Sequence, residues 1–170
     1  MLYVRQLKAG RDFGKRNPAC AQMQNFIYLL GDKAARKCVV VDPAWAIDDV
    51  IDAAHMDRME IVGALCTHYH PDHIGGDLWG HTVEGLPALL AKNPCPIHVH
   101  RLEAHGVKVM TGISDLVLHD SGDKVTVGAL EIELLHTPGH TPGSLCFRIP
   151  DGIVSGDTLF LQGCGDRKST

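Results

Sequence analysis

The sequence predicts an α/β (α+β) fold in which sheets and helices are stacked in layers. In the first half of the chain, short β-branched segments alternate with segments of helical periodicity. From Gly122 onward, four short strand-like segments follow one another, separated by turn residues. The chain has 170 residues, of which 45% are hydrophobic and 21% charged, so it is long and apolar enough to bury a core. We therefore expect a single domain over residues 1–170.

The chain is expected to begin with an antiparallel meander. Three segments are rich in β-branched and other strand-forming residues, namely residues 2–7, 25–30 and 37–42. Gly31 and Asp32 are typical of a turn between the second and third strands. Pro43 ends the third strand, and apolar residues then recur at helical spacing over residues 47–57.

The remaining elements change from alternating helix and strand to strand alone. Residues 61–66 form a continuous apolar run, which is typical of a strand buried on both faces. A second helix is expected over residues 83–92, where Asn93 and Pro94 end it. The other expected strands are residues 96–100, 124–127, 130–135, 144–149 and 152–155.

Charge and targeting patterns exclude several classes of partner. The 16 basic and 20 acidic residues give a net charge of −4, which is not typical of a nucleic-acid binder. No apolar stretch approaches the ~18 residues of a membrane span, and residues 1–8 lack the pattern of a secretory signal. The six cysteines contain no Cys-x-x-Cys pair, which favours reduced thiols. We expect a cytoplasmic protein that acts on a small-molecule substrate, with no nucleic-acid or membrane partner and an oligomeric state that the sequence does not indicate.

The most informative segment carries four metal-ligating side chains immediately after the buried strand. They are His68, His70, Asp72 and His73. Imidazole and carboxylate groups are typical ligands of zinc and similar metals. His68 and His70 are two residues apart, so an extended backbone directs both to one side, whereas Asp72 and His73 follow the turn imposed by Pro71. This spacing favours two metal ions over one tetrahedral ion.

Two later segments add further ligands. Residues 136–144 predict a tight turn between two strands that presents His140, and residues 155–158 present Asp157 at the end of a strand. A carboxylate has two oxygens, so Asp157 can bridge two cations.

These motifs resemble those of the metallo-β-lactamase superfamily. The motifs are His-x-His-x-Asp-His, then Thr-Pro-Gly-His-Thr-Pro-Gly-Ser, then Ser-Gly-Asp-Thr-Leu-Phe. Residues 25–29, 40–43 and 159–165 most resemble the glyoxalase II (hydroxyacylglutathione hydrolase) branch. The resemblance implies a four-layer αββα sandwich. It also implies that this metallo-β-lactamase-type domain lacks the usual C-terminal elements.

The resemblance also implies a ligand set. His68, His70 and His140 would hold one metal, Asp72 and His73 the other, and Asp157 would bridge them. Two zinc ions are expected, with iron or manganese as alternatives. No histidine follows His140, where the family supplies the last ligand of the second metal, so occupancy by one metal is also an alternative.

The implied activity is that of a metal-dependent hydrolase. A metal-bound hydroxide, oriented by the catalytic residue Asp72, would cleave a thioester or a related ester or lactone. Asp166 stands where the family has an arginine, and most of its glutathione-binding residues lie beyond this chain, so substrate-binding residues are not carried over. The alternatives are a mononuclear iron persulfide dioxygenase that uses His68, His140 and Asp157, and a truncated, non-catalytic metal-binding fragment.

Seven histidines remain outside this set. His55, His81, His105 and His119 are expected at the surface, and His98 and His100 at ordinary positions of a sheet. His136 precedes the turn of His140, where a hydrogen bond that supports the ligands is expected.

Overall fold

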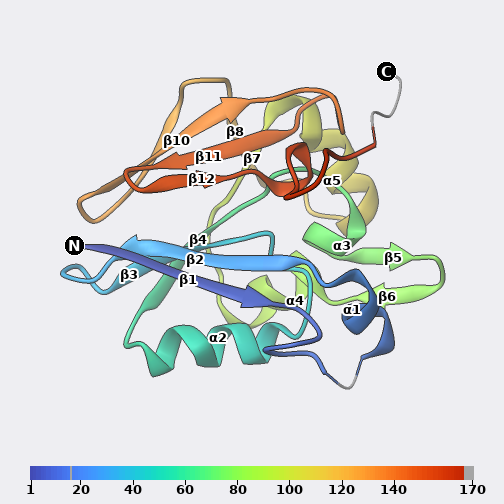
Figure 1. The fold of residues 1–170 in the computed structure, drawn as a ribbon, viewed down its shortest axis with the longest axis horizontal. Helices are drawn as coiled ribbons and strands as arrows, with labels where there is room; N and C mark the ends of the chain where they lie inside the picture. Colours follow the sequence, from blue (N-terminus) through green and yellow to red (C-terminus); the bar gives the residue numbers. More distant parts are fainter. Residues whose placement is uncertain (16, 167–170) are drawn as a thin grey trace.

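The computed structural model describes residues 1–15 and 17–166, which form two β-sheets packed face to face, with helices outside one of them (Figure 1). The larger sheet has the strand order β1-β2-β3-β4-β7-β8. Its strands are β1 (Leu2–Lys8), β2 (Phe26–Asp32), β3 (Lys37–Val41), β4 (Glu60–Leu65), β7 (Ile97–His100) and β8 (Val117–His119). Strands β1 to β3 are antiparallel, as expected, and β3, β4, β7 and β8 are parallel to one another.

The smaller sheet is antiparallel throughout, with the order β12-β11-β10-β9. Its strands are β9 (Lys124–Val127), β10 (Leu130–His136), β11 (Leu145–Ile149) and β12 (Gly152–Val154). A separate hairpin is formed by β5 (Gly76–Leu78) and β6 (His81–Val83). The four expected C-terminal strands are therefore present.

The helices pack on the larger sheet. They are α1 (Pro18–Met23), α2 (Ile47–Met56), α3 (Pro71–Ile74), α4 (Gly85–Lys92) and α5 (Ala104–Thr111). The 3-10 turn η1 (Arg101–Glu103) precedes α5, whereas η2 (Gly156–Thr158) follows β12 and contacts β11 of the smaller sheet. Figure 1 shows α2 and α4 on the face of the larger sheet that points away from the smaller one.

Alternation along the strands divides the apolar residues between two cores. Leu29 and Val40 join the core beneath the helices, to which each α-helix described here contributes a buried residue. Leu30 and Val39 point the other way and pack against the smaller sheet, for example against Phe147. Because successive side chains of a strand point to opposite faces, the larger sheet is apolar on both sides. The described residues thus supply helix, sheet and sheet in the order expected for the αββα sandwich.

Two of the expected elements differ in detail from the structure, and α1, α5, β5, β6 and β8 were not expected. Gly31 and Asp32 are not a turn: they pair with β3, and the turn lies at residues 33–36. The Asp32 carboxylate accepts hydrogen bonds from the Met1 amino group and from the backbone N–H of Ala34 and Ala129, which holds this end of β2 extended.

The second helix also begins later than expected, at Gly85 instead of residue 83. Val83 ends β6, and Gly85 has a φ of +56°, where an added Cβ would lie 2.1 Å from the carbonyl oxygen of Ile74. A glycine is required here because the chain passes close to α3 in a left-handed conformation.

The state of the cysteines and the lengths of the helices were also compared with expectation. All six cysteines are free thiols in the structure. The longest described helix falls well short of a bilayer-spanning apolar segment.

Candidate metal centre

The predicted ligands lie where the ends of three strands meet. The loop after β4 carries His68 and His70, and α3 follows it, with Pro71 at the first helical position. The connection between β10 and β11 carries His140, and η2, directly after β12, carries Asp157. The structure therefore brings together segments from both sheets at one end of the interface between them (Figure 1).

The first group of candidate ligands is His68, His70 and His140, whose ligand atoms all lie within 4.8 Å of one another. His140 Nδ1 lies 3.0 Å from the carbonyl oxygen of Asp166, so this nitrogen is the donor and Nε2 carries the lone pair. Nε2 lies 3.0 Å from His70 Nδ1. Two ring nitrogens at this separation share either a proton or a cation.

The second group consists of His68, His73 and Asp157. His73 Nδ1 donates to Asp42 Oδ2 at 2.9 Å, and Nε2 faces Asp157 Oδ1 at 3.2 Å. Burial lowers the pKa of His73, but its hydrogen bonds to Asp157 and Asp42 outweigh this effect and raise the pKa well above its ordinary value. The environment of this imidazole therefore favours positive charge, whether a proton or a metal ion supplies it.

Asp157 connects the two groups. Its Oδ1 faces His73 and its Oδ2 lies 3.4 Å from His140 Nε2. Burial raises the pKa of Asp157, but the hydrogen bond and charge of His73 hold it below its ordinary value. The carboxylate therefore stays ionised, with one oxygen directed at each group.

Asp72 lies at the margin of this cluster. It is buried, its Oδ2 is 3.6 Å from His73 Nε2, and it belongs to neither group. The same oxygen accepts a hydrogen bond from Asn25 Nδ2 at 3.1 Å. The structure thus places all six predicted residues together, and it adds Asn25 as a neighbour that the sequence did not indicate.

A buried carboxylate, Asp42, fixes the orientation of two of these histidines. Asp42 accepts hydrogen bonds from the backbone N–H and the hydroxyl of Thr67, both at 2.7 Å, and from His73 Nδ1. Because the Thr67 hydroxyl donates its proton to Asp42, it accepts from His68 Nδ1, 2.9 Å away. Both rings therefore present Nε2 to the site, as ligating histidines do.

A second buried carboxylate, Glu103, joins the two loops of the first group. It accepts hydrogen bonds from the backbone N–H of Tyr69 at 2.8 Å, the backbone N–H of Gly143 at 2.7 Å and the hydroxyl of Thr141 at 3.0 Å. Burial raises the pKa of Glu103, and these three donors oppose that effect. Tyr69 adjoins His70, and Thr141 adjoins His140, so Glu103 sets the separation of the two ligand-bearing loops.

The donor set fits divalent metal ions. The neighbouring nitrogen and oxygen atoms described above are separated by 3.0 to 3.6 Å. Ligands at about 2.0–2.2 Å from a common zinc ion lie about 3.0–3.6 Å apart in tetrahedral or octahedral arrangements. Imidazole and carboxylate groups also suit iron and manganese, so the geometry fits the group without selecting the element.

The histidines outside the cluster are placed largely as expected, with one exception. His55, His81 and His105 are exposed, but His119 is buried, which corrects the expectation of a surface position. The strand β8 adds to the edge of β7 and brings His119 Nε2 to 2.9 Å from His98 Nδ1.

His136 and His100 support the turn that carries His140. Their rings stack at a centroid distance of 4.1 Å, and His136 Nε2 lies 2.9 Å from the carbonyl oxygen of Pro142. The expected supporting hydrogen bond of His136 is therefore made to the backbone of this turn.

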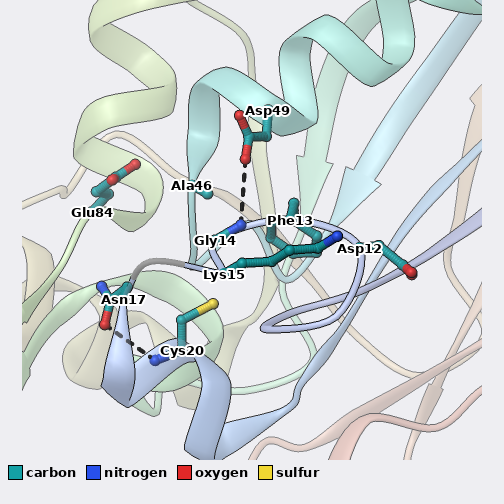
Figure 2. A pocket seen from close by; sticks show the side chains of 9 residues that line it. All are labelled: Asp12, Phe13, Gly14, Lys15, Asn17, Cys20, Ala46, Asp49 and Glu84. Carbon is teal, nitrogen blue, oxygen red and sulfur yellow. Dashed lines mark hydrogen bonds between the residues drawn. The ribbon is translucent and has the colours of Figure 1, made fainter.

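A cavity of about 490 Å³ lies in a different part of the molecule (Figure 2). Its lining comes from the loop after β1, from α1 and from the start of α2, and it includes none of the candidate metal ligands. Asp49 and Glu84 in its wall accept hydrogen bonds from the backbone N–H of Gly14 and Ile47. These hydrogen bonds hold the loops that line the cavity. We assign the cavity no role in the metal centre.

Comparison with known proteins gives the same family. Residues 21–169 match the family model described as metallo-beta-lactamase superfamily. The chain belongs to the metallo-β-lactamase superfamily. It is 37% identical over 153 residues to a hydroxyacylglutathione hydrolase of Pseudomonas putida, covering 83% of this chain and 50% of that protein. It is 28% identical over 141 residues to the probable polyketide biosynthesis zinc-dependent hydrolase BaeB of Bacillus velezensis, covering 83% and 58%.

Among solved structures, this metallo-β-lactamase-superfamily chain is similar to ETHE1 from Myxococcus xanthus. The TM-score is 0.73 at 25% identity, and the match covers 96% of this chain and 60% of that one. The chain spans about half the length of the curated hydroxyacylglutathione hydrolases that it matches.

Proposed function

We propose that this protein is a metal-dependent hydrolase that cleaves a thioester or a related ester or lactone. The observation that carries the proposal is the Asp157 carboxylate, which directs one oxygen to His73 and the other to His140. This is the arrangement expected of a residue that bridges two cations. The names of relatives, which include hydroxyacylglutathione hydrolases and a zinc-dependent hydrolase, support the same reaction class.

The ligand assignment is part of the proposal. His68, His70 and His140 hold one ion, Asp72 and His73 hold the other, and Asp157 bridges them; zinc is the expected element. Two such ions supply a water nucleophile at neutral pH and polarise the carbonyl group of the substrate.

The residues of this chain supply orientation and charge. Asp42 and Thr67 hold His73 and His68 with Nε2 toward the site. The buried carboxylate of Asp72 accepts a hydrogen bond from the attacking water and aligns it with the carbonyl carbon. A thioester suits this site because a thiolate leaves without a strong general acid. The six free thiols support a cytoplasmic location.

The decisive experiment combines metal analysis with a substrate panel. The metal-loaded protein is offered thioesters, among them an acylglutathione, and lactones, and its zinc content is measured. Two zinc ions per chain with thioester or lactone turnover support the proposal. Loss of turnover in D72N with both ions retained identifies Asp72 as the catalytic residue.

A second candidate is a mononuclear iron persulfide dioxygenase, which the likeness to ETHE1 favours. In that case His68, His140 and Asp157 hold a single iron ion. One iron per chain and oxygen uptake with glutathione persulfide identify this activity. Consumption of neither substrate class identifies a metal-binding fragment without turnover.

A further inference from the structure

The residue before β2, Asn25, places its amide group against the second group of ligands. Its Nδ2 lies 3.1 Å from Asp72 Oδ2 and 3.1 Å from His73 Nε2. Its Oδ1 is buried and has no hydrogen-bond partner among the described residues. One end of this amide therefore faces the site, and the other is buried without a partner.

The orientation of His73 decides which end of the amide suits a loaded site. His73 donates from Nδ1 to Asp42, so in the neutral ring that binds a metal the lone pair lies on Nε2, the nitrogen that faces Asn25 and Asp157. When that lone pair binds a cation, an amide N–H cannot point at the same nitrogen. A half-turn of the amide exchanges Nδ2 and Oδ1 in nearly the same volume and presents an oxygen instead.

The spacing of the atoms around this position is that of a coordination shell. The amide atom of Asn25 lies 3.1 Å from two neighbours, and His73 Nε2 lies 3.2 Å from Asp157 Oδ1 and 3.6 Å from Asp72 Oδ2. Ligands of a common zinc ion at about 2.0–2.2 Å have these separations. The atoms of Asn25, His73 and Asp72 therefore have the mutual separations of ligands of one cation, and Asp157 Oδ1 lies beside the same nitrogen of His73.

We propose that Asn25 is a ligand of the second cation through its amide oxygen. With it, the second cation would be held by His73 Nε2 and by oxygens of Asn25 and Asp72, in addition to Asp157, which the proposed function assigns as the bridge. The inference rests on the proposed two-metal centre and names a ligand that neither the sequence motifs nor the family resemblance assigned. The competing role is that Asn25 keeps its amide N–H on Asp72 and merely positions that carboxylate.

The two roles differ in the size of the effect on zinc binding. Removal of a group that only hydrogen-bonds to a ligand lowers metal affinity about 10–100-fold. If Asn25 is a ligand, Asn25→Ala lowers the affinity for the second zinc ion more than about 100-fold and leaves the first ion in place. The control is Asn93→Ala, because Asn93 donates to the carbonyl oxygen of Ile61 at the opposite end of β4 and faces no candidate ligand.

The experiment titrates the metal-stripped 170-residue chain and both variants with zinc ions by calorimetry, and counts bound zinc by elemental analysis. A crystal structure of the zinc-loaded wild type is the second measurement, and it does not depend on how the variants fold. We expect Asn25 Oδ1 at about 2.0–2.2 Å from an ion.

Three results overturn the inference. They are a loaded structure in which the amide still donates to Asp72, a second-site affinity that changes 100-fold or less in Asn25→Ala, and binding of one zinc ion by the wild type. Failure of the wild type to bind any metal overturns the proposed function as well, whereas binding of two ions by the wild type with a change of 100-fold or less in Asn25→Ala overturns the role of Asn25 alone.

Discussion

His68 has an unusual position, because it is shared by both groups of candidate ligands. Its ring lies 4.6 Å from that of His70, 4.2 Å from that of His73 and 4.7 Å from that of His140. It is also the most deeply buried of these histidines, with 1% of its surface exposed. Changes at His68 therefore affect the whole centre, whereas changes at its neighbours affect one side.

This position leads to a prediction about metal content. We expect His68→Ala to lose the first ion and to bind the second more weakly, because the His68 ring also packs against His73, whereas His70→Ala should lose the first ion alone. Elemental analysis after dialysis measures the metal per chain, and circular dichroism confirms that the variants are folded. His55→Ala, on the exposed face of α2, is the control and should retain both ions. Unchanged metal content in His68→Ala contradicts the ligand assignment.

Asp42 is a second residue whose role can be isolated. It is buried, has a φ of +52° and accepts three hydrogen bonds, from Thr67 and His73. Asp42→Asn keeps the shape of the side chain but places an amide NH2 or a weaker acceptor against these donors. We expect the affinity for the ion on His73 to fall about 10–100-fold. We also expect the free energy of unfolding to fall by about 1–3 kcal/mol, as measured by zinc titration and urea denaturation.

The exposed Asp48, on α2, provides the matched control for this change. Asp48→Asn should leave zinc affinity unaltered, because Asp48 contacts Lys92 and not the site. Equal zinc affinities in Asp42→Asn and the wild type would show that the orientation of His73 does not depend on Asp42.

The clustering of the candidate ligands could be predicted from the sequence, but the residues that support them could not. His68, His70 and His73 are close in sequence, so their clustering is visible in one short segment. Asp42 meets His73 across 31 residues, Asn25 meets Asp72 across 47, and Glu103 meets Gly143 across 40. A single carboxylate or amide in a long chain carries no local pattern, and the fold alone reveals these contacts.

At the scale of secondary structure, elements with a clear apolar pattern could be predicted, whereas the eight-residue α5 and the short α1, β5, β6 and β8 could not. The apolar run of β4 and the helical periodicity of α2 extend over enough residues to define their period. The strands β5, β6 and β8 have three residues each, and α1 has six. Such elements form because neighbouring elements supply their hydrogen bonds and contacts, as β7 does for β8.

The pairing of β7 with β8 makes stability depend on pH. Burial and the charge of His119 lower the pKa of His98 to about 4. The ordinary pKa of a histidine, about 6.5, applies to the unfolded chain, which therefore binds more protons between these values. The contribution of His98 to stability is present above about pH 6.5 and is lost as the pH falls toward 4.

This dependence can be measured on the metal-stripped protein by urea denaturation at pH 7, 5.5 and 4.5. We expect the wild type to lose more stability over this range than His98→Gln, which has no titrating ring at this position. The same change at the exposed His81 should leave the change of unfolding free energy with pH as it is in the wild type. If the free energy of unfolding changed with pH equally in the wild type and in His98→Gln, His98 would not be a source of the pH dependence.

At the scale of the whole molecule, the candidate centre lies between two separate cores. One core lies between the larger sheet and the helices, and the other lies between the two sheets. His70 and His73 follow a strand of the larger sheet, whereas His140 and Asp157 come from connections of the smaller one. Ions held by these four residues therefore connect the two sheets.

Removal of metal should accordingly destabilise the fold. Ligands that bind the native state alone, at 100 to 1,000 times the dissociation constant, stabilise it by about 3–4 kcal/mol. For a chain of this size that free energy corresponds to about 5–15 °C in the melting midpoint. We expect a shift of this size when calorimetric scans of the zinc-loaded protein are repeated with a chelator. The variant His68→Ala should show a smaller shift, and an unmoved midpoint in the wild type would contradict the bridging arrangement.

The segment of residues 163–166 lies beside the candidate centre, on a path by which ions can enter and leave. Gly165 packs so closely that an added Cβ would lie 2.3 Å from the carbonyl oxygen of Asp157 and 2.7 Å from His140 Nδ1. The Gly165 N–H donates to the backbone carbonyl oxygen of Asp157, and the Asp166 carbonyl oxygen accepts from His140 Nδ1, so residues 163–166 lie against the backbone of Asp157 and the ring of His140. An ion can exchange with solvent on this side when these two hydrogen bonds open. The rate of metal exchange is then governed by the local opening of a four-residue segment, and not by the strength of the ligands alone.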